Sequence, residues 1–346
     1  HRGSGELGAC PTARGRRMRP RVLVTRLDSA GDVLLAGPAI RAVARQADVT
    51  LLCSSVGLPA ARLLPDIRRM TFDAPWVHGN PPPVRARELA RLVWRLRGSD
   101  EAVILTSSFQ SSLPMALLLR LAGIRPITAI SDDYPGSLID NRVRPDYDLH
   151  EVQRSLAVTE AAGYPGSDDL RLIDELPAYP VPSEPYVVIH PGAEAQSRAI
   201  DPRTAAEAVT ELSAAGYQVL VTGSLSEKRL TARVAGTAGI DLGGRTTFGQ
   251  LAFVLRGAQA AIVGNTGPAH LAASVGTPVV SLFTPVVPAH KWQPYGIATT
   301  VLGDQRAACA DTRARECPIP GHPCMAGVRG TDIAAAVAAL TVGVPA

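Results

Sequence analysis

The chain alternates short β-branched runs with longer stretches whose apolar residues recur at helical spacing. Residues 21–25 (RVLVT) form such a run, and the apolar positions from 33 to 44 then follow one face of a helix. In the first half the pattern predicts strands at 21–25, 49–53, 102–106 and 126–130, and helices at 33–44, 85–96, 113–121 and 150–162. Because strands that alternate with helices pair in parallel, we expect a parallel sheet covered by helices.

The same alternation restarts after a proline-rich segment, residues 176–185 (LPAYPVPSEP), which has no apolar period and is predicted to be a linker. Further strands are predicted at 186–189, 218–222, 260–263 and 278–283, and helices at 204–215, 227–235, 248–255 and 331–340. This predicts two Rossmann-like, doubly wound α/β domains that face a central cleft, with ligands at the carboxyl ends of the strands. The predicted domains are a disordered extension at 1–17, a first domain at 18–175, the linker, a second domain at 186–330, and a C-terminal helix and tail at 331–346.

Composition narrows the class of protein. Of the 346 residues, 46% are hydrophobic and 19% are charged, which is typical of a globular chain, and no apolar run reaches the roughly 18 residues of a membrane-spanning helix. The formal net charge of +4 comes from scattered arginines, so it argues against nucleic acid and suits an anionic small substrate. An odd number of widely spread cysteines indicates a reducing cytoplasm.

The clearest candidate site is the segment 264–270 (GNTGPAH). A predicted strand ends at Gly264, and Pro268 stands where the first turn of a helix would begin. Two glycines allow close approach of the backbone, and free N–H groups at a helix N-terminus bind a diphosphate. The alternative interpretation is an ordinary strand-to-helix turn capped by Thr266.

Two other junctions carry candidate chemistry. Residues 190–193 (HPGA) lead to Arg198, which could neutralise a leaving diphosphate through paired hydrogen bonds or simply be a solvated surface arginine. Asp32, at the start of the first predicted helix, could be a general base facing the cleft or a helix N-cap. As a base it requires burial to offset the helix dipole, which lowers a carboxyl pKa.

Other chemistries find little support. Neither Gly31 nor Gly264 opens a G-x-G-x-x-G run, and no G-x-x-x-x-G-K-[ST] loop occurs, so nicotinamide and P-loop chemistry are disfavoured. Cys309, Cys317 and Cys324, with His322 among them, suggest a zinc site at first sight. Their spacing is wider than the close cysteine pairs of structural zinc sites, so we expect ordinary thiols in a proline-rich loop and no metal.

Taken together, these junctions resemble glycosyltransferase family 9, the ADP-heptose heptosyltransferase family, from residue 18 to residue 340. The likeness is carried by residues 27–38 (LDSAGDVLLAGP), 150–163 (HEVQRSLAVTEAAG), 190–198 (HPGAEAQSR), 264–273 (GNTGPAHLAA) and 284–296 (TPVVPAHKWQPYG). The resemblance implies a GT-B fold, an ADP-activated sugar held mainly by the second domain, an acceptor held by the first, and transfer with inversion and without a metal.

The resemblance also implies roles for single residues. Asp32 would be the base that deprotonates the acceptor hydroxyl, and Arg198 would balance the charge of the diphosphate. The residues expected at the donor are His190, Gly192, Glu227 at the ribose, Gly244 and Thr246 at the adenine, and Asn265, Thr266, Gly267 and His270 at the phosphates and sugar. Asn265 and Arg198 depart from the aspartate and lysine frequent in the family, which puts the identity of the donor sugar in doubt.

The resulting hypothesis is an inverting, metal-independent transferase that moves heptose from ADP-heptose to a hydroxyl of a glycan, a lipid-linked saccharide or a secondary metabolite. It needs no cofactor beyond this donor substrate. Two alternatives stay open: a non-catalytic GT-B-like module that binds a nucleotide sugar, and a sugar-nucleotide epimerase or hydrolase. We expect a cytoplasmic protein and leave open a peripheral contact with the inner face of the plasma membrane, although no amphipathic stretch stands out to make it.

Overall fold

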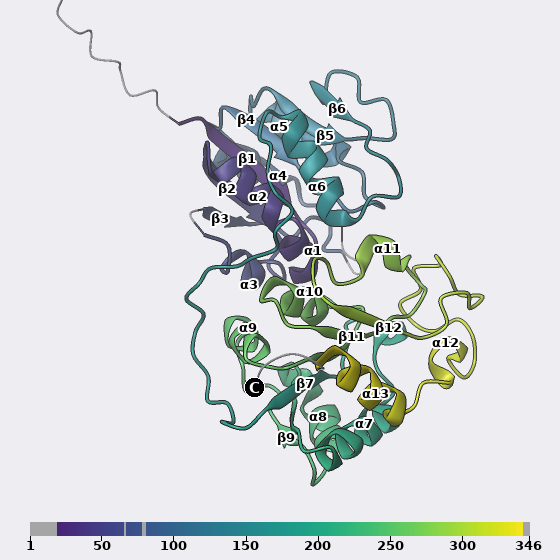
Figure 1. The fold of residues 1–346 in the computed structure, drawn as a ribbon. Helices are drawn as coiled ribbons and strands as arrows, with labels where there is room; N and C mark the ends of the chain where they lie inside the picture. The colour runs from purple at the N-terminus through teal and green to yellow at the C-terminus, as the bar shows by residue number, and fades with distance from the viewer. Residues whose placement is uncertain (1–18, 66, 78–80, 342–346) are drawn as a thin grey trace, which may run out of the picture.

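The computed structural model describes residues 19–65, 67–77 and 81–341. They form two six-stranded parallel sheets, of order β3-β2-β1-β4-β5-β6 and β12-β11-β10-β7-β8-β9, each covered by helices (Figure 1). This is the two-sheet α/β architecture that the sequence predicts. The predicted extension at 1–17 and the last part of the predicted tail, 342–346, lie outside the described residues.

The first sheet is built around a β-branched central strand that is buried on both faces. Its strands are β1 (Arg21–Arg26), β2 (Asp48–Cys53), β3 (Arg68–Thr71), β4 (Glu101–Ile104), β5 (Ile127–Ile130) and β6 (Asn141–Val143). Its helices are α1 (Ala30–Leu35), α2 (Gly37–Ala44), α3 (Leu58–Ala61), α4 (Ala86–Leu96), α5 (Leu113–Leu121) and α6 (Glu151–Ala161). Side chains of α4 and α5 share a core with one face of the sheet, and those of α2 and α3 share one with the other face.

The second sheet repeats this plan. Its strands are β7 (Tyr186–His190), β8 (Gln218–Val221), β9 (Ile240–Asp241), β10 (Ala261–Gly264), β11 (Val279–Leu282) and β12 (Thr299–Leu302). Its α-helices are α7 (Pro202–Ala214), α8 (Lys228–Ala235), α9 (Phe248–Arg256), α10 (Gly267–Ser274), α11 (Ala289–Trp292), α12 (Pro323–Ala326) and α13 (Gly330–Thr341). Two 3-10 helices, η1 (Gln196–Arg198) and η2 (Leu225–Glu227), precede α7 and α8.

One apolar core joins the two halves of the chain. Val22 and Leu34 of the first half belong to the same buried cluster as Val188, Leu251 and Ala269 of the second. Helix α1 packs against α10, and α3 packs against α9, so the helices between the sheets form the contact (Figure 1). Between α6 and β7, residues 162–185 contain no helix or strand, and the predicted linker 176–185 lies within that segment.

All eight predicted strands are present, and the four that the sequence did not predict are the edge strands of the two sheets. Strands β3, β6, β9 and β12 have two to four residues each, and their side chains are exposed or half-buried. Because none of them contains a run of buried apolar side chains, the hydrophobic pattern did not predict them. The predicted single helix at 33–44 is wrong. The chain forms α1 and α2, separated at Ala36, because Pro38 is tolerated in the first turn of a helix, here α2, but would interrupt the interior of a single helix.

Helix length gives one further observation. In the described ranges, no helix is long and apolar enough to cross a bilayer.

Candidate active site

A cavity of about 1260 Å³ lies between the two halves of the chain. Its walls come from loops that follow parallel strands: residues 28–32 after β1, residues 192–200 after β7, and residues 265–268 after β10. Ser224, Glu227 and Leu230 add a further wall from the segment after β8. The cavity is therefore at the carboxyl ends of the strands, where doubly wound sheets bind ligands.

Two helix N-termini meet beside this cavity, and they come from different sheets. A Cβ atom added to Gly31 of α1 would lie 2.9 Å from Cδ2 of His270 and 3.2 Å from Cα of Gly267, both on α10. Only a glycine permits this approach without displacing backbone. Gly31 thus sets how closely the loop that carries Asp32 comes to the 264–270 turn.

Asp32 lies in the first turn of α1 and lines the cavity, with 22% of its side chain exposed. The prediction that it could be the N-cap is wrong, because Ser29 is the N-cap and Asp32 completes a capping box with it. Oδ2 of Asp32 accepts a hydrogen bond of 2.7 Å from Oγ of Ser29, while Oδ1 lies 3.1 Å from Nη2 of Arg26.

These contacts determine the charge on Asp32. Burial alone would raise its pKa, but Arg26 and the hydrogen bond from Ser29 outweigh burial and hold the pKa below its usual value. The expectation that burial offsets the lowering influences is therefore not met. Asp32 is an ionised carboxylate at neutral pH, able to accept a proton as a weak base.

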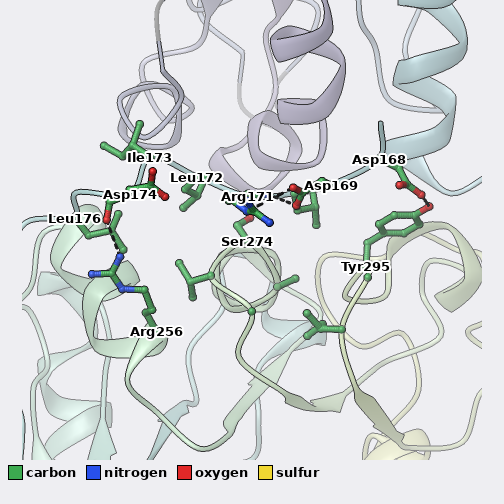
Figure 2. A pocket seen from close by; sticks show the side chains of 16 residues that line it. Asp168, Asp169, Arg171, Leu172, Ile173, Asp174, Leu176, Arg256, Ser274 and Tyr295 are labelled. Carbon is green, nitrogen blue, oxygen red and sulfur yellow. Dashed lines mark hydrogen bonds and ion pairs between the residues drawn. The ribbon is translucent and has the colours of Figure 1, made fainter. Parts of the chain in front are cut away.

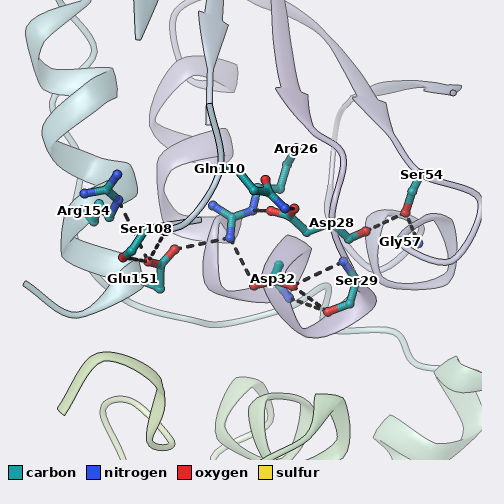
Figure 3. A network of polar contacts seen from close by, with 10 residues as sticks. All are labelled: Arg26, Asp28, Ser29, Asp32, Ser54, Gly57, Ser108, Gln110, Glu151 and Arg154. Carbon is teal, nitrogen blue, oxygen red and sulfur yellow. Dashed lines mark hydrogen bonds and ion pairs between the residues drawn. The ribbon is translucent and has the colours of Figure 1, made fainter. Parts of the chain in front are cut away.

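Arg26 is the centre of a buried charge network that the sequence patterns did not reveal (Figure 3). Its guanidinium has no exposed surface and lies 2.7 Å from Asp28, 3.1 Å from Asp32 and 3.3 Å from Glu151. Burial lowers the pKa of Arg26, but the three carboxylates outweigh it and raise the pKa above its ordinary value. Arg26 is the last residue of β1 and Glu151 the first of α6, 125 positions away, so only the fold brings them together.

Asp28 is a carboxyl of this network whose pKa is raised. Burial raises the pKa of Asp28 to about 7, and the nearby charges of Asp32 and Glu151 add to the effect, although Arg26 and Gln110 oppose it. The side-chain amide of Gln110 donates a hydrogen bond to Asp28. Three carboxyl groups around one cation thus include one that is easily neutralised.

The 264–270 turn has an open helix N-terminus. Thr266 stands at the N-cap position of α10, but its side chain makes no capping hydrogen bond and its hydroxyl instead donates to the carbonyl of Gly264. The alternative in which Thr266 caps the helix is therefore wrong. Thr266, Gly267 and Pro268 line the cavity. Pro268 has no N–H group and the N–H of Ala269 donates to the carbonyl of Thr266, so the N–H of Gly267 is the donor left at the positive end of the helix dipole.

Close packing supports this turn from behind. A Cβ atom on Gly264 would lie 2.2 Å from the carbonyl oxygen of Arg198, so β10 and η1 approach through a glycine. Asn265 lines the cavity, yet its amide oxygen accepts from the backbone N–H and the hydroxyl of Thr284, at 3.4 and 3.2 Å. His270 is not among the lining residues; it packs against Gly31, and burial lowers its pKa to about 4, despite Asp32, so it is neutral at pH 7.

Arg198 faces the same cavity from η1. Burial lowers its pKa, although the charge of Asp32 opposes the effect, and an arginine stays charged at neutral pH despite such a change. Its Nε atom is buried and has no hydrogen-bond partner in the described part of the chain. A half-buried cation with donors to spare, across the cavity from Asp32, can bind an anionic group.

Glu227 and Gly192 lie against each other at the cavity wall formed by the second half of the chain. The carboxylate of Glu227 accepts two hydrogen bonds of 2.7 Å from Ser224, and a Cβ atom on Gly192 would lie 1.9 Å from its Oε1. His190 lies behind them, with Nδ1 3.0 Å from the hydroxyl of Thr222 and Nε2 4.0 Å from Glu227. Burial lowers the pKa of His190, against the charge of Glu227, so the ring is neutral at pH 7.

The structure places Gly244 and Thr246 outside the residues that line the cavity. Gly244 has a φ of +63° and packs against Leu225 and Lys228, behind the wall formed by Glu227. Cavity residues that sequence reasoning missed include Ser226, Phe248, Arg313 and Arg315. The two arginines lie in the irregular loop before α12, and no periodic pattern there could have identified them.

Aromatic contacts join the two halves of the chain next to Arg313, which lines the cavity. The guanidinium of Arg313 lies 3.0 Å from the ring centroid of Phe109, and Phe109 stacks on Trp292 with centroids 5.2 Å apart. Phe109 follows β4 of the first sheet, whereas Trp292 ends α11 of the second half. The loop after β4 is thus held between two segments of the other half of the chain.

A second cavity, of about 430 Å³, lies beside the segment that connects the two sheets (Figure 2). Residues 168–174 form one wall, and Ser274 and Tyr295 lie on the other. Tyr295 donates a hydrogen bond of 2.6 Å to Asp168, and Arg256 donates one of 2.8 Å to the carbonyl of Asp174. None of the predicted site residues lines this cavity, which separates it from the proposed chemistry.

The two parallel sheets with the larger cavity between them form a GT-B fold. The chain belongs to glycosyltransferase family 9 (heptosyltransferase), whose family model matches residues 89–322, and is a glycosyltransferase. It is 28% identical, over 86% of its length and 87% of the relative's, to lipopolysaccharide heptosyltransferase 1 of Pseudomonas aeruginosa. The solved structure of E. coli ADP-heptose lps heptosyltransferase II superimposes with a TM-score of 0.69 at 19% identity, covering 93% of this chain and 98% of that one.

Another similar structure bears on metals. The iron-containing dodecameric glycosyltransferase TibC from enterotoxigenic E. coli superimposes with a TM-score of 0.58 at 14% identity, covering 95% of this chain and 77% of that one. Within the ranges described for this chain, no three His, Cys, Asp or Glu side chains are arranged to hold a metal ion. Cys309 and Cys324 are buried thiols in a small apolar cluster, and Cys10 lies outside the described residues.

Proposed function

We propose that this family 9 enzyme transfers heptose from ADP-heptose to an acceptor hydroxyl, with inversion and without a metal ion. The observation that carries the proposal is that an ionised Asp32, a half-buried Arg198 and the open N-terminus of α10 all line one cavity between two sheets. The names of similar proteins support the choice of donor, because one is described as an ADP-heptose enzyme and another as a lipopolysaccharide heptosyltransferase.

In the proposed reaction the acceptor oxygen attacks the anomeric carbon from the side of Asp32. A new bond forms between that oxygen and the carbon, the bond from the carbon to the diphosphate oxygen breaks, and the departing ADP keeps the electron pair. Asp32 takes the proton of the attacking hydroxyl. Because this carboxylate is a weak base, it accepts the proton after the new bond has begun to form, when the hydroxyl is more acidic.

The charge that develops on the departing diphosphate needs fixed donors. We assign Arg198 and the N–H group of Gly267, both at the cavity wall, to this charge, and donors of this kind are each worth about 2.7 to 4 kcal/mol in related chemistry. We assign Glu227 with Gly192 and His190 to the nucleoside. We still propose that Gly244 and Thr246 lie beside the adenine. Because neither residue lines the cavity and Leu225 packs against Gly244, Leu225 would have to move when the donor binds.

The acceptor is proposed to be a hydroxyl of a glycan, a lipid-linked saccharide or a secondary metabolite, held by residues 18–175, with the donor held by residues 186–330. A cytoplasmic site of action, with peripheral attachment to the inner face of the plasma membrane, completes this proposal. Lining residues on the acceptor side, such as Ser107 and Gln110, are polar and uncharged, as expected for sugar hydroxyls.

The test is to incubate purified protein with ADP-heptose and a panel of other nucleotide sugars, with and without cell extract, and to follow nucleotide release. ADP release from ADP-heptose that depends on extract is the expected result. Donor binding without release under any condition would identify a non-catalytic module, and release without extract would identify a hydrolase. An epimerase would convert the donor sugar with no nucleotide released. Repeating the assay after treatment with a chelator tests metal independence, and full activity is expected.

A further inference from the structure

Helix α4 presents two different faces. Leu92 and Leu96 are buried and share an apolar core with the first sheet, whereas Arg87, Arg91 and Arg95, at successive four-residue intervals, are exposed. The sequence pattern predicts this helix, but it does not show that these three arginines are exposed. The three arginines form a stripe that runs the length of the helix.

The charge of this stripe is uncompensated. Residues 85–97 contain five arginines against one glutamate, a net charge of +4 that equals the formal charge of the whole chain. Glu88 lies 3.3 Å from Arg85, and the stripe arginines form no ion pair with any residue of the described ranges. Like charges four residues apart on a helix repel one another, so the helix alone gives no reason for the arrangement.

Exposed apolar side chains accompany the arginines. Trp94 lies next to the stripe with 71% of its surface exposed, and Val84, just before the helix, is also 71% exposed. Trp94 borders a shallow hollow of about 480 Å³, which Met70, Arg95 and Arg97 also line. An indole among arginines matches the interface of a membrane, where cations meet lipid phosphates and the indole lies at headgroup level.

We propose that the exposed face of α4, formed by Arg87, Arg91, Trp94 and Arg95, binds the surface of a membrane that contains anionic lipids. Charge complementarity selects this partner. A single-stranded nucleic acid would require aromatic side chains in succession on which to stack bases, and this face has one. The face is too polar to enter the hydrocarbon, so attachment is peripheral and weakens with salt.

The inference rests on the proposed function, and it narrows the acceptor to a lipid-linked saccharide. Helix α4 packs on the sheet whose central strand leads to Asp32, so a docked α4 holds the acceptor side of the enzyme at the membrane. A membrane-borne acceptor then diffuses in two dimensions toward a cavity that is already beside it.

The test is vesicle flotation of the full chain, with phosphatidylcholine vesicles that contain one third phosphatidylglycerol and with phosphatidylcholine alone. The double variant Arg91→Gln/Arg95→Gln is compared with Arg229→Gln/Arg233→Gln, which removes two exposed arginines at the same spacing from α8. Wild type should bind only the anionic vesicles. Each arginine removed from α4 should weaken binding about fivefold at low salt, so about 25-fold for the pair, while the α8 pair has no effect.

A second measurement uses the indole. The fluorescence of Trp94 should shift to shorter wavelength on anionic vesicles, and Trp94→Leu should abolish that shift while the protein keeps its circular dichroism spectrum. Absence of wild-type binding, equal losses in both double variants, or tighter binding to a single-stranded oligonucleotide than to vesicles would each overturn the proposal.

Sugar transfer is assayed separately, by ADP release with acceptor extracted into detergent micelles, where no membrane is present, and the α4 pair should leave it unchanged. Vesicle binding by a chain that transfers no sugar would refute the proposed function and still support the membrane surface. Sugar transfer by a chain that does not bind vesicles would support the proposed function and refute the membrane surface.

Discussion

Nη2 of Arg26 lies 3.1 Å from Oδ1 of Asp32 and 3.3 Å from Oε2 of Glu151, so one buried guanidinium joins the proposed base to the first turn of α6. The contact fixes the carboxylate of Asp32 on one side while Ser29 fixes it on the other. A base held from both sides keeps its orientation when the acceptor enters, which is what efficient proton transfer requires.

The same network predicts a pH dependence of stability. Burial raises the pKa of Asp28 to about 7, far above its value in the unfolded chain, so the folded state binds this proton more tightly. The resulting stabilisation is complete below about pH 4, is lost progressively as pH rises from about 4 to about 7, and changes no further above pH 7. The total is roughly 4 kcal/mol, at 1.4 kcal/mol for each pH unit between the two pKa values. The side chain introduced by Asp28→Asn cannot ionise, so this variant should not lose stability from this group as pH rises.

Thermal unfolding of wild type and Asp28→Asn at a series of pH values between 5 and 8.5, in the same buffer strength, measures this difference. The melting temperature of the variant should rise relative to wild type as pH increases from 5 to about 7, and the difference should level off at higher pH. Parallel curves for the two proteins would show that Asp28 does not carry the raised pKa.

Gly31 should tolerate no side chain. In Gly31→Ala the new Cβ would lie 2.9 Å from His270 and 3.2 Å from the backbone of Gly267, so α1 and α10 must separate. We expect a loss of about 1 to 3 kcal/mol in stability. We also expect at least a tenfold fall in kcat/KM, because a small misplacement of reacting groups is costly.

The matched control is Gly327→Ala, where an added Cβ meets nothing within 4 Å and φ is −87°. It should leave both stability and turnover near wild type. Wild-type kinetics in Gly31→Ala would show that the close approach of α1 to α10 is not needed for activity.

Arg198 should act on the leaving group more than on donor binding. Arg198→Ala removes a donor that strengthens its interaction as the diphosphate departs, so kcat should fall by about 10² to 10³. Arg198→Lys retains the charge but not the paired hydrogen bonds and should recover part of the loss. Arg203→Ala, on the exposed start of α7, is the control, and steady-state ADP release measures all three. A change in KM alone would assign Arg198 to ground-state binding.

The sequence predicts the inner strands well, because each is a buried apolar run. The sequence does not predict the four edge strands, because they are only partly buried. It also does not predict the break between α1 and α2, which a proline causes. Cavity-lining residues that follow a strand, such as Asp32, Arg198 and Thr266, could be predicted from the sequence because the carboxyl ends of parallel strands converge. Their roles stay predictions. Partners such as Glu151 and Arg313 are not, since they reach the site through contacts between distant segments.

The central claim is that Asp32 accepts the proton of the acceptor, and Asp32→Asn tests it most directly. ADP binding by calorimetry and ADP release from ADP-heptose with extract are measured on this variant and on Asp133→Asn, an exposed aspartate away from the cavity. The account predicts that Asp32→Asn binds ADP like wild type and releases it at least about 10² times more slowly, with Asp133→Asn unchanged. Turnover near the wild-type rate in Asp32→Asn would contradict it.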